Sequence, residues 1–432
     1  MALSSRLLRA CLIAGALLCS ACSVIAAPNE TVSASGHDLS IDHLQRIEPA
    51  LQEEVDNGVR AGFVAVVVDK NGAVYETAVG MADLYNAVPA TAQTRFRIAS
   101  MTKPVVTAAV MQLVDRGDVR LNDPVSRFIP AFADLRVATS PERNGDGEFE
   151  TRAPARQMTI HDLLTHMSGL GYVFDYETDL GKAYLAADLY GKTGSLAERM
   201  NILAALPLYE DPGRKWRYSY ATDVAGRVIE VASGRTLEDF LKQNMFEPLG
   251  MNDTEFFLDE TDFERLAVVN EFDESGDLVR LEAASPDRAG VNDEAFGVMS
   301  GGAGLVSTGR DFSRFMLMLL NEGELDGARL LSPATVRLML RDHVPYDARP
   351  EDWREKGLTF GLGGAIIVEP GYFGAVAAKG EWGWSGFWDT WFFITPELGV
   401  GAVLLAQTQS NAFTPTSRAR DRLKAIVYGA LE

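Results

Sequence analysis

A serine and a lysine stand three residues apart where an apolar run begins, in the stretch FRIASMTKPVVTAAVMQLVDRG of residues 96–117. Three residues are nearly one helical turn, so the side chains of Ser100 and Lys103 would share one face of a helix. A hydroxyl beside an amine that can accept its proton is the chemistry of an activated serine nucleophile. The alternative interpretation is a helix start that carries a surface lysine.

The surroundings of this pair favour the chemical interpretation. No other lysine of the chain has a serine three residues before it. The apolar residues that follow predict a buried helix with Lys103 in its first turn. Burial and the positive end of the helix both disfavour the charged form of that amine. The N–H groups at the helix start also point toward Ser100, where they can stabilise an oxyanion.

A tyrosine is the second candidate for proton transfer. Tyr218 lies in KWRYSYATDVAGRVIEVASG, residues 215–234, directly before a second helix with apolar periodicity. A phenol at such a junction can point into a cleft and move protons when cations favour its ionised form. The alternative interpretation is ordinary aromatic packing.

A glycine-rich and tryptophan-rich strand is the third candidate, in KGEWGWSGFWDTWFFITPE of residues 379–397. Glycines inside a strand pattern often mark a close approach of two backbones. The alternative is a well-packed strand with a bulge.

Other catalytic motifs fit the chain less well. No Gly-x-Ser-x-Gly elbow is present, since GWSGF fails at its last position. His161 and His166 are five residues apart and lack the zinc-binding His-Glu-x-x-His pattern, and we interpret His166 as a structural residue hydrogen-bonded near a loop. YGKTG at 190–194 lacks the first glycine of a P-loop, and SGGAGL at 300–305 predicts a tight turn. We expect no metal and no cofactor.

Composition indicates an ordinary globular protein with a strongly acidic surface. The chain has 432 residues, of which 47% are hydrophobic and 23% charged, and its formal net charge is −20. Such a charge repels phosphate groups, which argues against nucleic acid as a partner.

The first residues predict a signal peptide, residues 1–27, rather than part of the fold. Arg6 and Arg9 precede an apolar run too short for a confident membrane span, and small residues follow. Cleavage after Ala26 or Ala27 fits this pattern. We therefore expect an exported protein, periplasmic or secreted.

A lipoprotein signal is the second interpretation of the same stretch, with a lipid on Cys22 as the only link to a membrane. All three cysteines, Cys11, Cys19 and Cys22, lie inside the signal. After cleavage at Ala26 or Ala27 the chain would have no disulfide and no thiol nucleophile. Residues 28–40 are polar and predict a flexible tether.

Both ends of the remaining chain predict parts of one sheet. Residues 41–58 have helical spacing, and two β-rich runs then flank Asn71-Gly72, a strong hairpin signal, which places strands within 60–80. LTFGLGGAIIV, GYFGAVAAKG, GFWDTWFFITP and LGVGAVLLAQTQ predict successive strands within 358–408, and PTSRARDRLKAIVYGAL predicts a closing helix.

The middle of the chain, about 105–340, is mostly helical in pattern. An exposed polar insertion is expected at 136–157. Short helices are expected in TIHDLLTHMSGL, ending near Gly169, in TLEDFLKQNMFEPLGM, ending at Pro248 and Gly250, and in STGRDFSRFMLMLLNEGEL. The fold class is therefore α+β, an antiparallel sheet flanked by helices with an inserted helical part.

Six segments in this order resemble the serine β-lactamase-like hydrolases, which include class C β-lactamases, D-alanyl-D-alanine carboxypeptidases and family VIII carboxylesterases. The segments are RIASMTKP, TIHDLLTHMSGL, YSYATDVAG, FEPLGMNDT, SGGAGLVSTGRDFSRFM and FWDTWFFITPE. The resemblance covers about residues 41–430. It implies a single β-lactamase/DD-peptidase-like domain over residues 41–432.

The resemblance also implies catalytic roles. Ser100 would be the nucleophile and Lys103 its amine partner. Tyr218 would be the general base that later helps to activate the deacylating water. The backbone N–H groups of Ser100 and Phe387 would form the oxyanion hole.

The third family motif corresponds here to Trp384, Ser385 and Gly386, as in the esterase branch. These residues would bind substrate together with Tyr220 and with Tyr172, which lies in the aromatic stretch GYVFDY.

Two departures bear on specificity. Penicillin-active relatives usually have an asparagine where this chain has Tyr220, and a cation where it has Trp384. The absence of the cation removes a charge-assisted contact worth roughly 1.5–3 kcal/mol, and the absence of the asparagine removes a neutral contact worth about 1 kcal/mol.

We therefore expect a secreted carboxylesterase that forms an acyl-enzyme on Ser100 and acts on small neutral esters, short-chain or aromatic. A β-lactamase, a D-alanyl-D-alanine carboxypeptidase or D-amino peptidase, and an acyltransferase are the alternatives. A non-catalytic receptor of the same fold is a further one, and the oligomeric state stays open.

Overall fold

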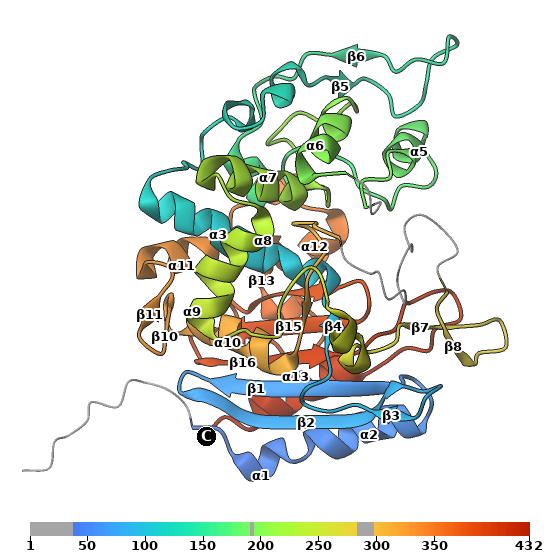
Figure 1. Cartoon of the computed structure of the whole chain (residues 1–432), viewed down its shortest axis with the longest axis vertical. Helices are drawn as coiled ribbons and strands as arrows, with labels where there is room; N and C mark the ends of the chain where they lie inside the picture. Colours follow the sequence, from blue (N-terminus) through green and yellow to red (C-terminus); the bar gives the residue numbers. More distant parts are fainter. Residues whose placement is uncertain (1–37, 191–193, 283–297) are drawn as a thin grey trace, which may run out of the picture. The chain divides into compact units, whose positions relative to one another are not determined.

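Strands from both ends of the chain pair in one eight-stranded antiparallel sheet, as the sequence predicts (Figure 1). The order across the sheet is β12-β13-β14-β15-β16-β1-β2-β3. The strands are β1 (Gly62–Asp69), β2 (Gly72–Asp83), β3 (Val88–Pro89), β12 (Leu358–Phe360), β13 (Ala365–Ile367), β14 (Trp382–Gly386), β15 (Thr390–Thr395) and β16 (Val400–Leu405).

This computed structural model describes residues 38–190, 194–282 and 298–432. All of them belong to one compact unit. The predicted signal peptide with Cys22, and the tether except for residues 38–40, lie outside the described residues. Within the described ranges, no helix combines the length and the hydropathy needed to cross a membrane.

The first hairpin is held by an aspartate at its turn. Asp69 accepts hydrogen bonds from the N–H groups of Asn71 at 2.7 Å and Gly72 at 3.1 Å. Gly72 already belongs to β2, so the turn residues are Lys70 and Asn71, one position earlier than predicted.

Helices from both ends of the chain cover one face of the sheet. They are α1 (Ile41–Leu44), α2 (Ile47–Asp56) and α13 (Ala419–Gly429). The apolar residues of β1 alternate, with Phe63, Ala65 and Val67 on this face and Val64, Val66 and Val68 on the other. The single helix predicted at 41–58 is broken, because Pro49 inside a continuous helix would clash with the carbonyl of Gln45.

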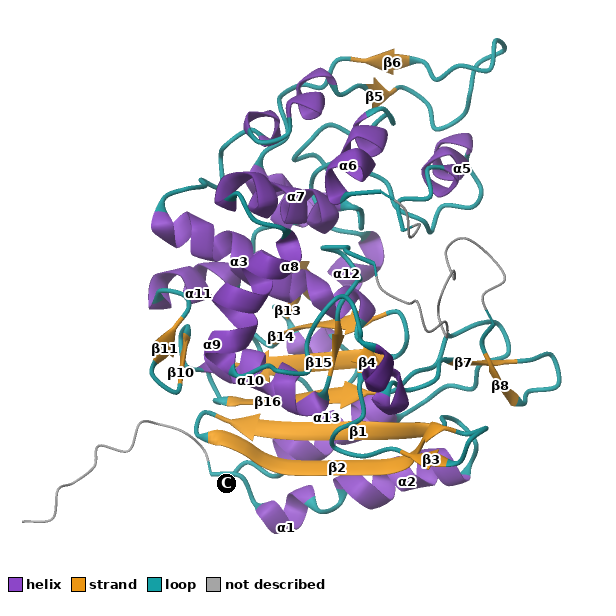
Figure 2. Cartoon of the chain, in the orientation of Figure 1, coloured by secondary structure: helices purple, strands orange, loops and turns teal. Residues whose placement is uncertain are grey.

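The other face of the sheet is covered by the helical part of the chain (Figure 2). Here α10 (Gly309–Leu320) contacts β1 and β16, and α3 (Thr102–Arg116) contacts α7 (Ala221–Ser233). The other helices of this part are α4 (Ile160–Leu164), α5 (Asp179–Ala186), α6 (Leu196–Ala204), α8 (Leu237–Leu241), α9 (Glu247–Leu249), α11 (Pro333–Met339) and α12 (Glu351–Glu355). The predicted insertion carries the short strands β5 (Val137–Ala138) and β6 (Thr151–Arg152).

One predicted helix end, one of two predicted helix stops and one predicted strand were wrong. The helix α4 ends at Leu164 rather than near Gly169. A π-helical turn, Lys242–Phe246, joins α8 to α9, so the chain stays helical through Pro248. The helix ends at Leu249 with Gly250 as its C-cap, as predicted. The predicted strand GYFGAVAAKG, residues 371–380, is not formed: its first two residues belong to the 3₁₀ turn Pro370–Tyr372, and Gly374 and Gly380 adopt left-handed backbone angles.

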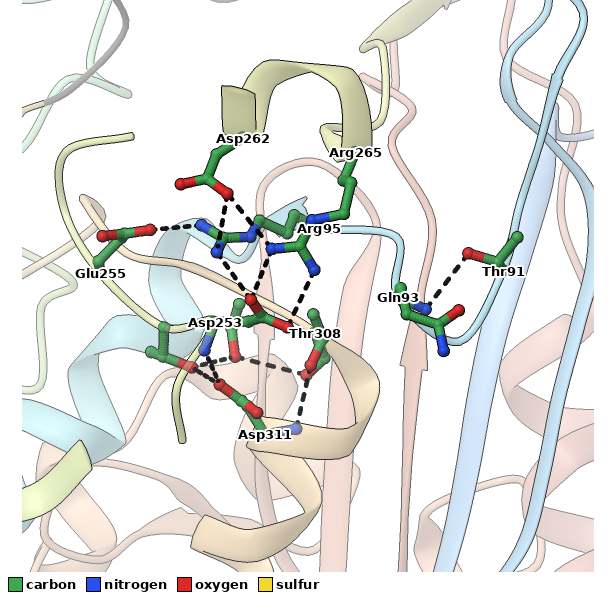
Figure 3. A network of polar contacts seen from close by, with 11 residues as sticks. Thr91, Gln93, Arg95, Asp253, Glu255, Asp262, Arg265, Thr308 and Asp311 are labelled. Atoms are coloured by element: carbon green, nitrogen blue, oxygen red, sulfur yellow. Dashed lines mark hydrogen bonds and ion pairs between the residues drawn. The ribbon is translucent and has the colours of Figure 1, made fainter. Parts of the chain in front are cut away.

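A buried arginine anchors the segment that leads to the Ser-x-x-Lys motif (Figure 3). Arg95 precedes β4 (Phe96–Arg97), pairs with Asp253 at 2.7 Å and also contacts Glu255. Arg265 pairs with the same Asp253 at 2.6 Å. Asp311 of α10 accepts a hydrogen bond from the N–H of Asp253 at 2.7 Å. This network fixes β4 against α10 and so fixes the start of the next segment.

Candidate active site

The serine of the motif lies on a tight turn just before a buried helix. Ser100 belongs to the 3₁₀ turn Ala99–Met101, and α3 follows at once. Ala99 has φ +44°, a left-handed conformation that side chains other than glycine rarely adopt. It packs in a small apolar cluster with Val269, Leu281 and Trp388. Ser100 is 9% exposed, so its hydroxyl lies at the edge of the packed interior.

The lysine of the motif is buried and touches the serine. Lys103 is 1% exposed, and its Nζ lies 3.3 Å from Ser100 Oγ. The same Nζ donates to the carbonyl oxygen of Gly302 at 2.7 Å. The spacing of the motif therefore yields the predicted contact between hydroxyl and amine.

Tyr218 reaches the same amine from the loop before α7. The centroid of its ring lies 4.6 Å from Lys103 Nζ. Its ring also packs against His166 at 4.9 Å and Trp384 at 5.6 Å. The structure thus brings Ser100, Lys103 and Tyr218 together, although 115 residues separate the lysine from the tyrosine (218 minus 103).

His166 supports Tyr218 from within the protein. It is fully buried, has φ +54°, and its Nδ1 lies 3.2 Å from the hydroxyl of Ser219. Burial, and then the charge of Lys103, hold the pKa of His166 well below its usual value. The imidazole is therefore neutral near pH 7 and fits the structural role predicted for it.

An aromatic cavity of 340 Å³ opens beside Tyr218. Its walls include Tyr172, Phe174 and Trp216. The ring of Tyr172 lies 5.2 Å from Lys103 Nζ, and its hydroxyl is 2.5 Å from that of Tyr190. The stretch GYVFDY thus provides the predicted aromatic wall.

Tyr220 lines a different cavity from the one that Tyr218 lines. It is 1% exposed, packs against Tyr172 at 4.7 Å, and lines a second cavity of 350 Å³ together with Tyr190. Its predicted contact with substrate stays a prediction.

Gly386 allows β14 to approach the segment that precedes Ser100. A Cβ atom at this position would lie only 2.3 Å from the carbonyl oxygen of Ile98 and 2.1 Å from Oγ1 of Thr390. Phe387 follows directly, 45% exposed, with its ring 5.9 Å from that of Phe174. The oxyanion role of the Ser100 and Phe387 N–H groups stays a prediction.

Neighbouring side chains of β14 point to opposite faces of the sheet. Trp384 faces Tyr218 and Phe360. Ser385 lines a cavity of 290 Å³ with Arg420 and Lys424 of α13, and Trp384 also reaches this cavity. The structure thus places Trp384, and not Ser385, against the Ser100 side of the sheet, and the predicted substrate contact of either residue stays a prediction.

Sequence reasoning missed two participants, Asp223 and Gly302. The glycine cluster at 300–305 was predicted only to form a turn, yet Gly302 accepts the hydrogen bond of Lys103. Its N–H lies 3.3 Å from Oδ1 of Asp223, a buried carboxyl group in the first turn of α7. Burial raises the pKa of Asp223, and a hydrogen bond from Ser300 opposes that rise. The three glycines of SGGAGL were the only signal.

The arrangement can perform acyl transfer through a serine. A hydroxyl contacts an amine, a phenol packs on that amine, and the phenol lines an aromatic cavity. In the part of the chain that the structure describes, no three His, Cys, Asp or Glu side chains gather where they could hold a metal ion. The sheet, the inserted helices and this site together define a serine hydrolase with a β-lactamase/penicillin-binding-protein-like fold.

Comparison with known proteins supports this class of protein. The model of the beta-lactamase family matches residues 47–426, and the chain belongs to this family. Esterase EstB of Burkholderia gladioli is 31% identical over 385 residues, which cover 84% of this chain and 90% of EstB. The predicted family and fold class are thereby confirmed.

Two solved structures have the same fold. EstCE1, described as a hydrolase with promiscuous acyltransferase activity, has a TM-score of 0.74 and 26% identity, covering 90% of this chain and 99% of its own. Simvastatin synthase LovD from Aspergillus terreus has a TM-score of 0.74 and 26% identity, covering 90% of this chain and 98% of its own. This chain is thus a serine hydrolase of the esterase or acyltransferase type.

Proposed function

We propose that the protein is a carboxylesterase that hydrolyses small neutral esters, short-chain or aromatic, through an acyl-enzyme on Ser100. One observation carries the proposal: Lys103 Nζ lies 3.3 Å from Ser100 Oγ while the ring of Tyr218 lies 4.6 Å from the same Nζ. A hydroxyl nucleophile beside an amine, with a phenol ring packed on that amine, supplies the groups that covalent catalysis by a serine requires.

The first half-reaction forms the acyl-enzyme. As Ser100 Oγ bonds to the carbonyl carbon, its proton moves to the base formed by Lys103 and Tyr218. The proton then passes to the oxygen of the leaving alcohol while the ester C–O bond breaks. The acyl group remains on Ser100. In this proposal, the N–H groups of Ser100 and Phe387 hold the negative oxygen of the intermediate.

The second half-reaction releases the acid. A water molecule gives a proton to the same base while its oxygen bonds to the acyl carbon. The proton returns to Ser100 Oγ as the bond between that oxygen and the acyl carbon breaks. The enzyme is regenerated, and no other reactant is needed.

The walls of the aromatic cavity support a neutral substrate. Its charged side chains already have partners: Arg217 pairs with Glu210 at 2.9 Å, and Asp175 accepts from the hydroxyl of Tyr209 at 2.7 Å. Aromatic rings supply most of the remaining wall, and a carboxylate would meet a protein of net charge −20. We therefore expect faster turnover of p-nitrophenyl butyrate than of the anionic β-lactam nitrocefin.

Replacing the proposed nucleophile tests this function. S100A should lower kcat for p-nitrophenyl butyrate at least about 1,000-fold, because no other hydroxyl can replace Oγ. The matched control is S332A at the N-cap of α11, which should keep wild-type activity. Retention of wild-type activity by S100A would end the proposal.

Transfer of the acyl group to an alcohol is the second candidate function. The description of EstCE1 as a hydrolase with acyltransferase activity favours it, since one acyl-enzyme serves both reactions. With 1-butanol added to p-nitrophenyl butyrate, butyl butyrate should form at a rate that rises with alcohol concentration. Release of butyric acid alone at every concentration would exclude transfer to this alcohol.

We also propose that the protein is exported, periplasmic or secreted, with residues 1–27 removed. The arginines followed by an apolar run and small residues support this. The lipid-anchored form, with a lipid on Cys22, is the alternative.

A further inference from the structure

Asp223 is a buried carboxyl group that the proposed mechanism does not use. It lies in the first turn of α7 and is 4% exposed. Its Oδ1 accepts from the hydroxyl of Ser300 at 2.5 Å and from the N–H of Gly302 at 3.3 Å. Its Oδ2 is also buried, and among the residues that the structure describes it has no hydrogen-bond partner. A buried carboxyl with an unpaired oxygen costs stability unless another interaction offsets it.

The glycine loop at 300–304 connects this carboxyl to the catalytic amine. Gly302 receives Lys103 Nζ at its carbonyl oxygen, 2.7 Å away, while its own N–H is held by Asp223. A Cβ at Gly302 would lie 2.5 Å from Oδ2 of Asp223, and one at Gly301 would lie 2.5 Å from the carbonyl of Thr222. The loop therefore rests directly on the first turn of α7, and only glycine fits at these two points.

Asp223 and Lys103 also interact electrostatically. After burial, the charge of Lys103 is among the causes that set the pKa of Asp223, and it lowers that pKa. Asp223 in turn is among the causes that raise the pKa values of Tyr172 and Tyr190, again after burial. The titratable or charged groups that face Asp223 are Lys103 of α3, Arg199 of α6, Tyr172 and Tyr190. The groups of this kind that face Lys103 are His166, Tyr172, Tyr218 and Asp223.

We infer that Asp223 is a positioning residue for Lys103: it holds the 300–304 loop through the N–H of Gly302, and the carbonyl oxygen of the same Gly302 receives Lys103 Nζ. The inference rests on the proposed esterase function. An anion near an amine favours the ammonium form. Removing the anion lets the amine lose its proton at lower pH.

D223N tests the inference, because asparagine keeps an acceptor for Ser300 and Gly302 but removes the charge. The readout is kcat/KM for p-nitrophenyl butyrate between pH 5 and 9, whose acid limb reports the essential base of the free enzyme. We expect that limb to move at least about half a pH unit to lower pH. If Asp223 had only a structural role, D223N would lower the thermal stability and leave the acid limb of the kcat/KM profile in place.

A matched control is D162N. Asp162 is also a buried aspartate in the first turn of a helix, but it caps α4 and pairs with Arg156. This variant should lose stability without any movement of the acid limb. If D223N does not accumulate as folded protein, the same pH profile is measured on D223S, which has a smaller uncharged side chain.

The outcomes separate this inference from the proposed function. A wild-type protein that hydrolyses no ester would end the proposed function. A wild-type protein that hydrolyses the ester, with D223N or D223S keeping the wild-type acid limb, would overturn the role of Asp223 alone.

Discussion

His166 makes the stability of the protein depend on pH. Its pKa is held well below its usual value by burial and by the charge of Lys103, so the unfolded chain binds a proton more readily than the folded chain. Stability from this residue is fully present above the unfolded pKa of about 6.5 and is lost as pH falls toward the folded pKa. We expect His166 to account for about 1 kcal/mol of lost stability between pH 7.5 and 5.5.

Comparing H166N with wild type in urea at both pH values measures that contribution. The variant is less stable at pH 7.5, but its free energy of unfolding should fall less on acidification. H43N, at a histidine outside this cluster, is the control for the substitution itself. An equal loss in H166N and wild type would contradict the assignment.

Single residues were predictable where chemistry and spacing coincide. The contact of Ser100 with Lys103 follows from a three-residue spacing at a helix start. Tyr218 was found from its place before an apolar helix. Gly302 and Asp223 were not predicted as participants, because their partners lie 199 and 77–79 residues away in the sequence. Only the packing of the loop on α7 reveals them.

At the scale of elements, the fit of β14 against the segment before Ser100 depends on Gly386. A methyl group there would overlap the carbonyl of Ile98 and the hydroxyl of Thr390. G386A should cost about 1–3 kcal/mol of stability and lower kcat more than it raises KM, because β14 must move away from the nucleophile. G371A, at a glycine with open space around it, is the control. Wild-type kcat in G386A would show that this close approach is not needed.

The arginine network of Figure 3 should matter for stability more than ordinary surface pairs do. Arg95 is 4% exposed and its removal leaves the carboxylates of Asp253 and Glu255 without their shared partner. We expect R95A to lose about 2–3 kcal/mol in urea unfolding. R422A, which breaks the exposed pair with Glu53, should lose less stability than R95A, because solvent screens an exposed ion pair. Equal losses in the two variants would contradict the anchoring role of Arg95.

The existence of elements was predictable, but their ends were not. Apolar residues at helical spacing identified α10, and two β-rich runs around Asn71-Gly72 identified the β1–β2 hairpin. The ends depended on particular contacts, such as the π turn that lets the chain remain helical through Pro248. The run GYFGAVAAKG has the composition of a strand, but its exposed position and its glycines prevent pairing.

At the scale of the whole molecule, the sheet joins the two ends of the chain, with β1 pairing to β16. The order of strand-rich and helix-rich segments predicted this layout. It could not predict which strands pair, since that depends on contacts between residues more than 300 positions apart.

Export is a whole-molecule prediction that intact mass can check. Protein recovered from the periplasm or medium should begin at Ala27 or Pro28, because small residues precede the cleavage point. A mass that begins at Cys22 with added lipid would support the anchored form. A protein that keeps Met1 and stays in the cytoplasm would contradict export.

The acyl-enzyme is the central claim, and trapping it is the most direct test. Wild-type protein is mixed with p-nitrophenyl butyrate, quenched in acid within milliseconds, digested and measured by mass spectrometry. The account predicts a butyryl group on the peptide that contains Ser100, and none on that peptide in S100A. A butyryl group on another residue in the wild type, or turnover with no acylated peptide and full activity in S100A, would contradict it.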